Sequence, residues 1–291
     1  MGMEADAVRR RLHPEGVVSY GIDRSVDCGV SLDAICSAVG ETVEQGGTGV
    51  VLQGGTQTLD GLVSVLAEVK GRFPAVWIHG FSAGVILSLA KDSGMSLTDT
   101  VARLRDAGLN SLAGDDAGIL DNAVQLQGAR GTVEDWVRVH RTSHGLGMRT
   151  TAAMRFGCGE TIEQRMNHLE VVRLLQEETG GFTAFLPAVF EPVRAGVRGF
   201  EEATAVEYLK TLAISRMVLE NIVNVQTDLE TQGLKVVQMA LRFGGNDVGS
   251  VTQGNAGSPN AATEEQLRQV IRDAGFKPVQ RDTVYRTMYL N

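Results

Sequence analysis

The chain has 291 residues, of which 43% are hydrophobic and 21% charged, and it contains 35 glycines. This composition indicates a folded α/β protein, because disordered chains are poorer in apolar residues and richer in net charge. The formal charge of -8 leaves no basic face for phosphates, which argues against nucleic acid and anionic membranes as partners.

Three cysteines, Cys28, Cys36 and Cys158, are too few for a disulfide framework and fit a reducing compartment. No stretch approaches the ~18 consecutive apolar residues of a membrane span, and the N-terminus carries no apolar run of the signal-peptide type. We therefore expect a cytoplasmic protein that acts on a small molecule and is compatible with an oligomeric state.

From Val17 onward, short β-branched runs alternate with longer helical patterns, which is typical of strand-helix units around a parallel sheet. The predicted strands are Val17–Ile22, Gly49–Gln53, Ala75–His79, Leu109–Leu112, Arg149–Phe156, Phe182–Leu186, Asn224–Asp228 and Asp247–Val251. The predicted helices between and after them are Leu32–Gln45, Leu59–Arg72, Val85–Ser93, Leu97–Ala107, Val133–Leu146, Ile162–Glu178, Ala205–Asn221 and Leu234–Phe243.

Eight strands with intervening helices predict a closed (β/α)8 barrel of the TIM type. An extra C-terminal helix, Glu264–Asp273, follows the barrel. We expect an N-terminal extension over residues 1–16 and one barrel domain over 17–291, with the C-terminal helical part beginning near 262. In such barrels the functional groups come from the loops at the carboxyl ends of the strands.

Several of these loops carry motifs that together resemble one family, the radical S-adenosylmethionine (SAM) enzymes related to dehypoxanthine futalosine cyclase, aminofutalosine synthase and FO synthase. The strings, in chain order, are LQGG at Leu52–Gly55, IHGFS at Ile78–Ser82, LRDAGLNSL at Leu104–Leu112, VRVHRTSHGLGMRTTAAM at Val137–Met154, GET at Gly159–Thr161, TGGFTAFLP at Thr179–Pro187, VQTDLETQGLKVVQMALRFGGND at Val225–Asp247 and RDAGFKPVQRDTVY at Arg272–Tyr285. Eight motifs in the family's order make the resemblance specific and extend it over nearly the whole chain.

The resemblance also implies a Cys-x3-Cys-x2-Cys loop after the first strand, which would hold a [4Fe–4S] cluster through three thiolates. Here Arg24 is followed by Ser25-Val26-Asp27-Cys28-Gly29, and the next cysteine is Cys36 on a predicted helix. We therefore expect no [4Fe–4S] cluster, and without it the family's radical chemistry does not transfer.

The resemblance still implies a pocket for SAM. Gln53-Gly54-Gly55 matches the position where relatives hold the methionine portion of SAM, although Gly54-Gly55 can also serve simply to turn the chain. The expected cofactor-binding residues are Gln53, Gly54, Gly55, His79, Ser82 and Asp115.

Other pocket positions differ from the family pattern, since aromatic residues expected after the sixth and seventh strands are replaced by Ala188 and Leu229. This argues against the futalosine-derived nucleoside as substrate. The expected catalytic residues are Asp27, Asp116, Glu191 and Arg155.

These residue types allow acid-base work and carboxylate binding. Alternatively, Arg155 forms an ion pair with Glu160 or Asp116. The alternative for the aspartates is that they are solvated loop residues without a catalytic role. Cys158 is open to two readings, a nucleophile or a small buried thiol, and the His140 and His144 pair favours a structural role over a metal site.

The sequence thus predicts a cluster-free radical-SAM-like enzyme that binds SAM and performs polar group transfer or cyclisation on a small molecule, in secondary metabolism. The alternative is a catalytically inactive homologue that binds a nucleoside or a partner protein.

Overall fold

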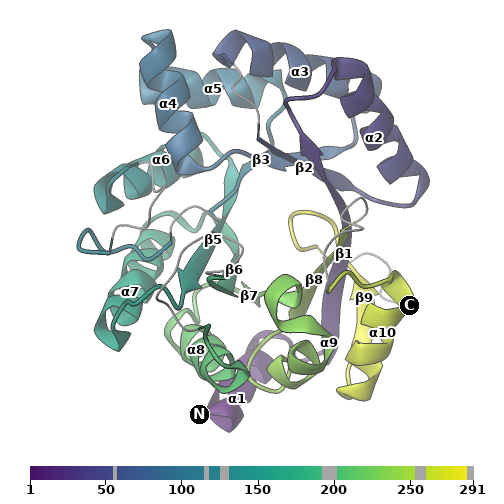
Figure 1. Cartoon of the computed structure of the whole chain (residues 1–291), viewed down its shortest axis with the longest axis vertical. Helices are drawn as coiled ribbons and strands as arrows, with labels where there is room; N and C mark the ends of the chain where they lie inside the picture. The colour runs from purple at the N-terminus through teal and green to yellow at the C-terminus, as the bar shows by residue number, and fades with distance from the viewer. Residues whose placement is uncertain (55–57, 115–117, 125–130, 192–201, 253–259, 287–291) are drawn as a thin grey trace.

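The computed structural model describes residues 1–54, 58–114, 118–124, 131–191, 202–252 and 260–286. Parallel strands form a ring in the order β7-β6-β5-β4-β3-β2-β1-β8, and helices surround the ring (Figure 1). A parallel bridge between Gln226 and Asp247 joins the two ends of this order, and the Thr227 N–H donates to the Asp247 carbonyl over 2.8 Å. The predicted (β/α)8 barrel is therefore confirmed.

The strands are β1 (Val17–Asp27), β2 (Gly49–Gln53), β3 (Trp77–Gly80), β4 (Ser111–Leu112), β5 (Arg149–Phe156), β6 (Phe182–Val189), β7 (Asn224–Val225), β8 (Asp247–Thr252) and β9 (Lys277–Gln280). The helices are α1 (Gly2–Leu12), α2 (Leu32–Glu44), α3 (Leu59–Arg72), α4 (Ala83–Ser93), α5 (Leu97–Ala107), α6 (Val133–Gly145), α7 (Ile162–Thr179), α8 (Ala205–Val218), α9 (Leu229–Ala240) and α10 (Glu264–Asp273).

The largest departure from the sequence expectation is in β1. This strand was predicted to end at Ile22, with a loop over 23–28, but it continues to Asp27 because Asp23 to Asp27 pair in register with Gly49 to Gln53 of β2. The loop prediction is wrong at these positions. Since side chains alternate along a strand, Asp23, Ser25 and Asp27 share one face of β1.

Two further elements were absent from the prediction. Helix α1 packs against α8, and strand β9 pairs with the first residues of β1 (Figure 1). Helix α9 begins five residues before the predicted start at Leu234, and Gly233 kinks it with a left-handed φ of 69°.

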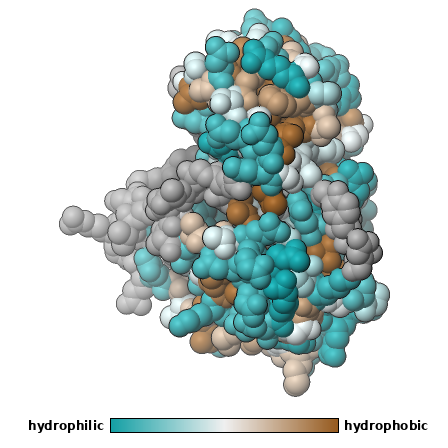
Figure 2. Space-filling view, turned by 90° about the vertical axis from the view of Figure 1, so that its right-hand side faces the viewer, coloured by the Kyte–Doolittle hydropathy of each residue, from teal (hydrophilic) through white to brown (hydrophobic). Residues whose placement is uncertain are grey.

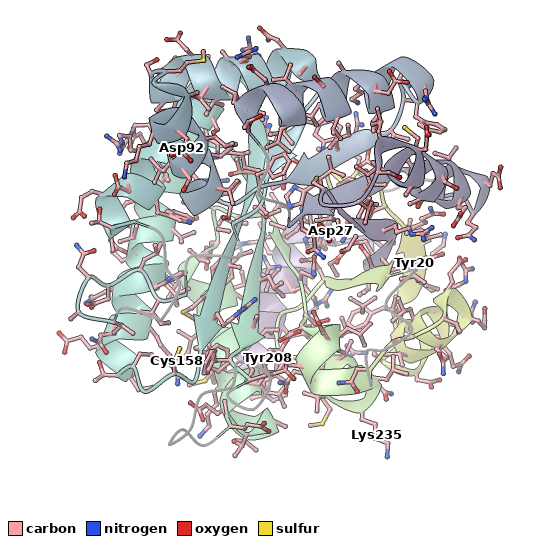
Figure 3. All side chains as sticks on the ribbon, turned by 45° about the horizontal axis from the view of Figure 1, so that its top comes forward. Tyr20, Asp27, Asp92, Cys158, Tyr208 and Lys235 are labelled. Carbon is pink, nitrogen blue, oxygen red and sulfur yellow. The ribbon has the colours of Figure 1, made fainter. Side chains whose placement is uncertain are left out.

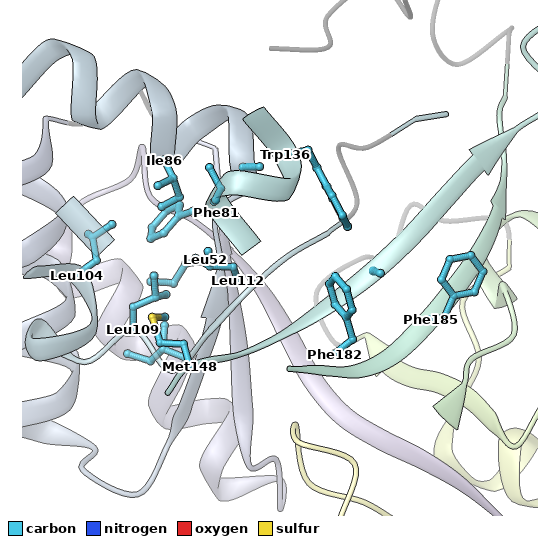
Figure 4. Packing of buried hydrophobic residues seen from close by; sticks show 14 of the residues in the cluster. Leu52, Phe81, Ile86, Leu104, Leu109, Leu112, Trp136, Met148, Phe182 and Phe185 are labelled. Carbon is cyan, nitrogen blue, oxygen red and sulfur yellow. The ribbon is translucent and has the colours of Figure 1, made fainter. Parts of the chain in front are cut away.

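The main core lies between the outer face of the ring and the helices. Leu52 and Leu112 of the strands pack with Phe81, Ile86 and Leu104 in this layer (Figure 4). The side chains of Thr132 and Thr161 cap α6 and α7 with reciprocal bonds from Asp135 and Gln164, as their spacing predicts.

A smaller apolar cluster joins β1 and β8 to α9 and α10, and it includes Val18, Val248, Leu267 and Phe276. Beyond β9 the chain turns into the ring, where the Arg281 N–H donates to the Tyr20 carbonyl over 2.8 Å (Figure 1). The end of the described chain therefore contributes to the barrel interior.

In the part of the chain that the structure describes, no helix is long and apolar enough to cross a membrane. The face seen in Figure 2 is mainly hydrophilic, and its apolar residues gather in small patches and in the hollow between its upper and lower parts.

Candidate functional site

A cavity of about 200 Å³ lies inside the ring. Its described lining combines polar groups with small apolar side chains: Asp23, Val51, His79, Ala113, Thr151, Ala152, Ala153, Ala184, Phe185, Leu186, Gln226, Ser250, Arg281, Thr283 and Tyr285. A second cavity of about 190 Å³ shares Leu186, Gln226 and Ser250 with the first and also includes Asp228 and Glu230. Together they form an internal site with several hydrogen-bonding groups.

Asp23 is the carboxylate in the wall of the first cavity, and it is 9% exposed. It accepts hydrogen bonds from the Ser250 hydroxyl at 2.6 Å and the Thr283 hydroxyl at 3.3 Å. The Arg281 guanidinium lies 3.9 Å from its Oδ2. From the sequence, Asp23 is one of several acidic loop residues that could act as general bases, whereas the structure places it on β1 in the cavity wall.

His79 lies on β3, which pairs with β2 so that His79 is in register with Val51, and it lines the same cavity. Its expected role in cofactor binding stays a prediction. Its Nδ1 is 2.7 Å from the Ser111 hydroxyl, which fixes the ring orientation. His79 and Asp23 therefore face one internal space from β3 and β1.

Asp27 lies at the carboxyl end of β1 (Figure 3), and Gly54 is close to its side chain. A Cβ atom on Gly54 would come within 2.6 Å of the Asp27 carboxylate, and the φ of Gly54 is left-handed at 69°. The Gly29 N–H donates to the same carboxylate at 2.8 Å. Glycine at 54 thus has a local structural cause, and the cofactor-binding roles of Gln53 and Gly54 stay predictions.

Arg155 is exposed near the end of β5, where strand alternation places it on the same side as the cavity residues Thr151 and Ala153. Its expected alternative partner Glu160 is instead bonded to Arg165 at 2.6 Å and to the N–H groups of Gly157 and Cys158. The Arg155–Glu160 pairing is therefore not formed.

Glu191 follows β6 and is partly buried. Ser82 is the N-cap residue of α4, and its side chain makes no capping hydrogen bond. The preceding residue, Phe81, is buried with a left-handed φ of 59°, a conformation that is costly for a bulky side chain. The remaining predicted site residues, Gly55, Asp115 and Asp116, lie outside the described residues.

Gln226, which follows β7, and the C-terminal residues Arg281 and Tyr285 are functional candidates that the sequence reasoning did not single out. Asp228 is one of the acidic loop residues that the sequence offered as general bases. The buried Asp228 carboxylate accepts from the Val189 N–H at 3.1 Å, and burial raises its pKa. The tail string ending at Tyr285 was recognised as a family motif, but sequence alone does not place it inside the barrel.

The three cysteines do not fit a [4Fe–4S] cluster. All three are buried: Cys28 and Cys36 belong to the main core, and Cys158 lies beyond β5, four strands from β1 in the ring order (Figure 3). Burial raises the pKa of Cys28 to about 11 and that of Cys158 to about 12, with contributions from Asp27 and Glu160. The described residues hold no group of three or more metal-ligating side chains.

Anaerobic treatment of the protein with iron and sulfide is therefore expected to leave no bound cluster. Cluster assembly needs thiolates that converge on one cube, and these three thiols are buried in different parts of the fold. The measurement is iron content and visible absorption after desalting, with the Cys28→Ser, Cys36→Ser, Cys158→Ser triple variant as control. Iron retained by the native chain and absent from the triple variant would contradict the expectation.

The family described as the CofH/MqnC C-terminal region matches residues 179–290. Cyclic dehypoxanthine futalosine synthase of Halalkalibacterium halodurans is 33% identical, over 98% of this chain and 86% of that protein. A 5-amino-6-(D-ribitylamino)uracil–L-tyrosine 4-hydroxyphenyl transferase of Methanococcoides burtonii is 35% identical, over 89% of this chain and 78% of that protein.

Among solved structures, methylornithine synthase superposes with a TM-score of 0.69 at 15% identity, covering 94% of this chain and 87% of that one. The hydrogenase maturase HydG of Carboxydothermus hydrogenoformans gives 0.72 at 12% identity, with coverages of 98% and 72%. These two likenesses concern the fold. The identities and coverages of the curated relatives show that the chain belongs to the radical SAM family of cyclic dehypoxanthine futalosine synthase, as its loop motifs indicated.

Proposed function

We propose that this protein is a biosynthetic enzyme that binds SAM in the barrel and performs a polar group transfer or cyclisation on a small molecule without an iron-sulfur cluster. The observation that carries the proposal is the polar cavity inside the ring, in a chain whose thiols are buried away from it. The names of the relatives, synthases and a transferase, support a biosynthetic role.

The charge of the site supports SAM as the ligand. SAM carries a sulfonium cation, and the interior and mouth of the barrel offer the carboxylates of Asp23 and Asp27. In a partly desolvated cavity an opposite charge a few ångströms away contributes on the order of 1–4 kcal/mol. In the proposed arrangement Gln53 and Gly54 hold the methionine portion near Asp27, with His79 and Ser82 on the neighbouring strand end.

A polar reaction needs a nucleophile, a base and a leaving group. A substrate nucleophile attacks a carbon bonded to the sulfonium sulfur, the C–S bond breaks, and its electron pair remains on sulfur, which becomes a neutral thioether. The nucleophile's proton passes to a carboxylate, for which Asp27, Asp116 and Glu191 are the candidates. Arg155 would bind a substrate carboxylate, and the barrel supplies alignment and exclusion of water.

Titration calorimetry with SAM and S-adenosylhomocysteine tests this function. We expect SAM to bind the iron-free protein at micromolar strength and S-adenosylhomocysteine to bind about tenfold more weakly, because it lacks the sulfonium charge that the carboxylates attract. Mass spectrometry of reactions with candidate substrates follows from that result. If neither ligand produces heat or thermal stabilisation, SAM is excluded, and a SAM-independent cyclase or the binding protein of the alternative hypothesis remains.

A further inference from the structure

The floor of the internal cavity is formed by the C-terminal segment 281–286. Tyr285 lines the 200 Å³ cavity and also a lower cavity of about 350 Å³ that includes His13 and Asn224, so its ring lies between the two. Its hydroxyl donates to Gln226 Oε1 at 2.5 Å. The segment thus closes the ring from below.

The backbone of this segment is shaped to carry Tyr285 inward. The Asp282 carboxylate accepts from the N–H groups of Val284 and Arg286, which makes a tight turn. Within that turn Tyr285 has a left-handed φ of 64°, which is costly for an aromatic residue and persists where surrounding contacts hold it. The Arg281 guanidinium, 4.0 Å from the ring centre, is one of those contacts.

Arg281 also sets the charge of the cavity. Its guanidinium makes a two-bond contact with Asp247, at 2.5 and 3.1 Å, whereas Asp23 is 3.9 Å away. Gly21 makes room for this arrangement, because a Cβ there would come within 2.9 Å of Arg281 and 2.8 Å of Ser250. In the described network one guanidinium therefore faces two carboxylates, and Asp23 is the less neutralised of them.

We propose that the segment 281–285 is the floor of the ligand site, and that the excess carboxylate charge it leaves at Asp23 selects a cationic or neutral ligand group and rejects an anionic one. The ionisable side chains in the described cavity lining are Asp23, His79, Arg281 and Tyr285, so Asp23 dominates the local field when His79 is neutral. This inference rests on the proposed function in taking the cavity as the ligand site, and it specifies the charge of the group that enters.

The selectivity can be measured without knowing the ligand. Val51 lines the cavity and is paired with Ser25, two positions from Asp23 along β1. A Val51→Cys variant places a thiol there, while the native cysteines are buried. The probes are a trimethylammonioethyl and a sulfonatoethyl methanethiosulfonate, which differ in charge. The readout is the ratio of their reaction rates with the introduced thiol, in which the effect of thiol pKa cancels. This ratio is divided by the same ratio for free 2-mercaptoethanol, which removes the intrinsic difference in reactivity between the two reagents.

We expect this normalised ratio to favour the cationic reagent about tenfold or more, and to fall severalfold toward one when Asp23→Asn is added. The matched control is Asp92→Asn, which makes the same change of net charge on the exposed surface of α4 (Figure 3) and is expected to leave the ratio unchanged.

A normalised ratio near one in the Val51→Cys protein, or one that Asp23→Asn does not lower, would overturn the inference. Cation preference together with absent SAM binding would uphold the inference while rejecting the proposed cofactor. SAM binding together with a ratio near one would do the reverse, so the two failures are distinguishable.

Discussion

Replacing Arg281 by Met is expected to lower the free energy of unfolding by about 3–5 kcal/mol, because it leaves the Asp247 carboxylate buried without its ion-pair partner. Asp247 is fully buried and receives two bonds from the guanidinium. Burial alone would lower the pKa of Arg281, but the neighbouring carboxylates of Asp247 and Asp23 raise it, so the guanidinium stays charged. The measurement is urea unfolding followed by far-ultraviolet circular dichroism.

Two companion variants identify the cause of that loss. Arg286→Met removes an exposed ion pair with Asp282 in the same turn and is expected to cost less than about 1 kcal/mol. Adding Asp247→Asn to Arg281→Met should recover part of the stability, because the orphaned charge is removed while the bond from the Gly249 N–H can remain. A loss for Arg281→Met as small as that for Arg286→Met would contradict the buried-pair explanation.

The barrel could be predicted from sequence because its units are locally encoded. The predicted bounds of α3, α5, β2 and β5 coincide with the observed ones. Thr58 and Ser96 supply side-chain caps at the starts of α3 and α5, and Gly108 ends α5. Periodicity and capping act over a few residues, so a single sequence contains the information.

The site was harder to predict because its parts come together only through long-range pairing. The second half of β1 lacks a β-branched run, and it is a strand because β2 pairs with it. The short strand β9 pairs with residues about 260 positions earlier and then directs Arg281 and Tyr285 inward. No local pattern encodes either event, so the surroundings of Asp23 and the position of the C-terminal floor were found only in the structure.

The buried His140 and His168 and the half-buried His144 are expected to make the fold labile to mild acid, and the buried His13, whose pKa burial also lowers, acts in the same direction. Burial lowers the pKa of His140 to about 3, with a further contribution from His144. Burial lowers that of His144 to about 4, together with the charge of Arg149, and that of His168 to about 3. The rings are held as neutral groups: both His140 and His144 bond Thr150, and His168 Nδ1 accepts from the Leu120 N–H. These bonds account for the His140 and His144 pair as structural residues.

The direction of the effect follows from proton linkage. Because the folded pKa values lie below the unfolded value of about 6.5, the unfolded chain binds more protons between pH 6.5 and about 4, and stability falls as pH is lowered through this range. Full protonation of one unfolded histidine costs about 1.4 kcal/mol per pH unit, so three histidines remove about 6 kcal/mol between pH 7 and pH 5. That is comparable to the whole stability of many domains.

The slope of unfolding free energy against pH, measured by urea titrations between pH 6 and pH 5, tests this account, and His168→Gln provides the comparison. Glutamine keeps an oxygen that can accept from the Leu120 N–H but does not titrate, so the slope should fall by about a quarter to a third even if the variant is less stable at pH 7. This pH window lies above the ordinary pKa values of aspartate and glutamate, which makes histidine protonation its main cause. An unchanged slope in His168→Gln would mean that the ring is already protonated in the folded protein, and that its burial does not control the acid response.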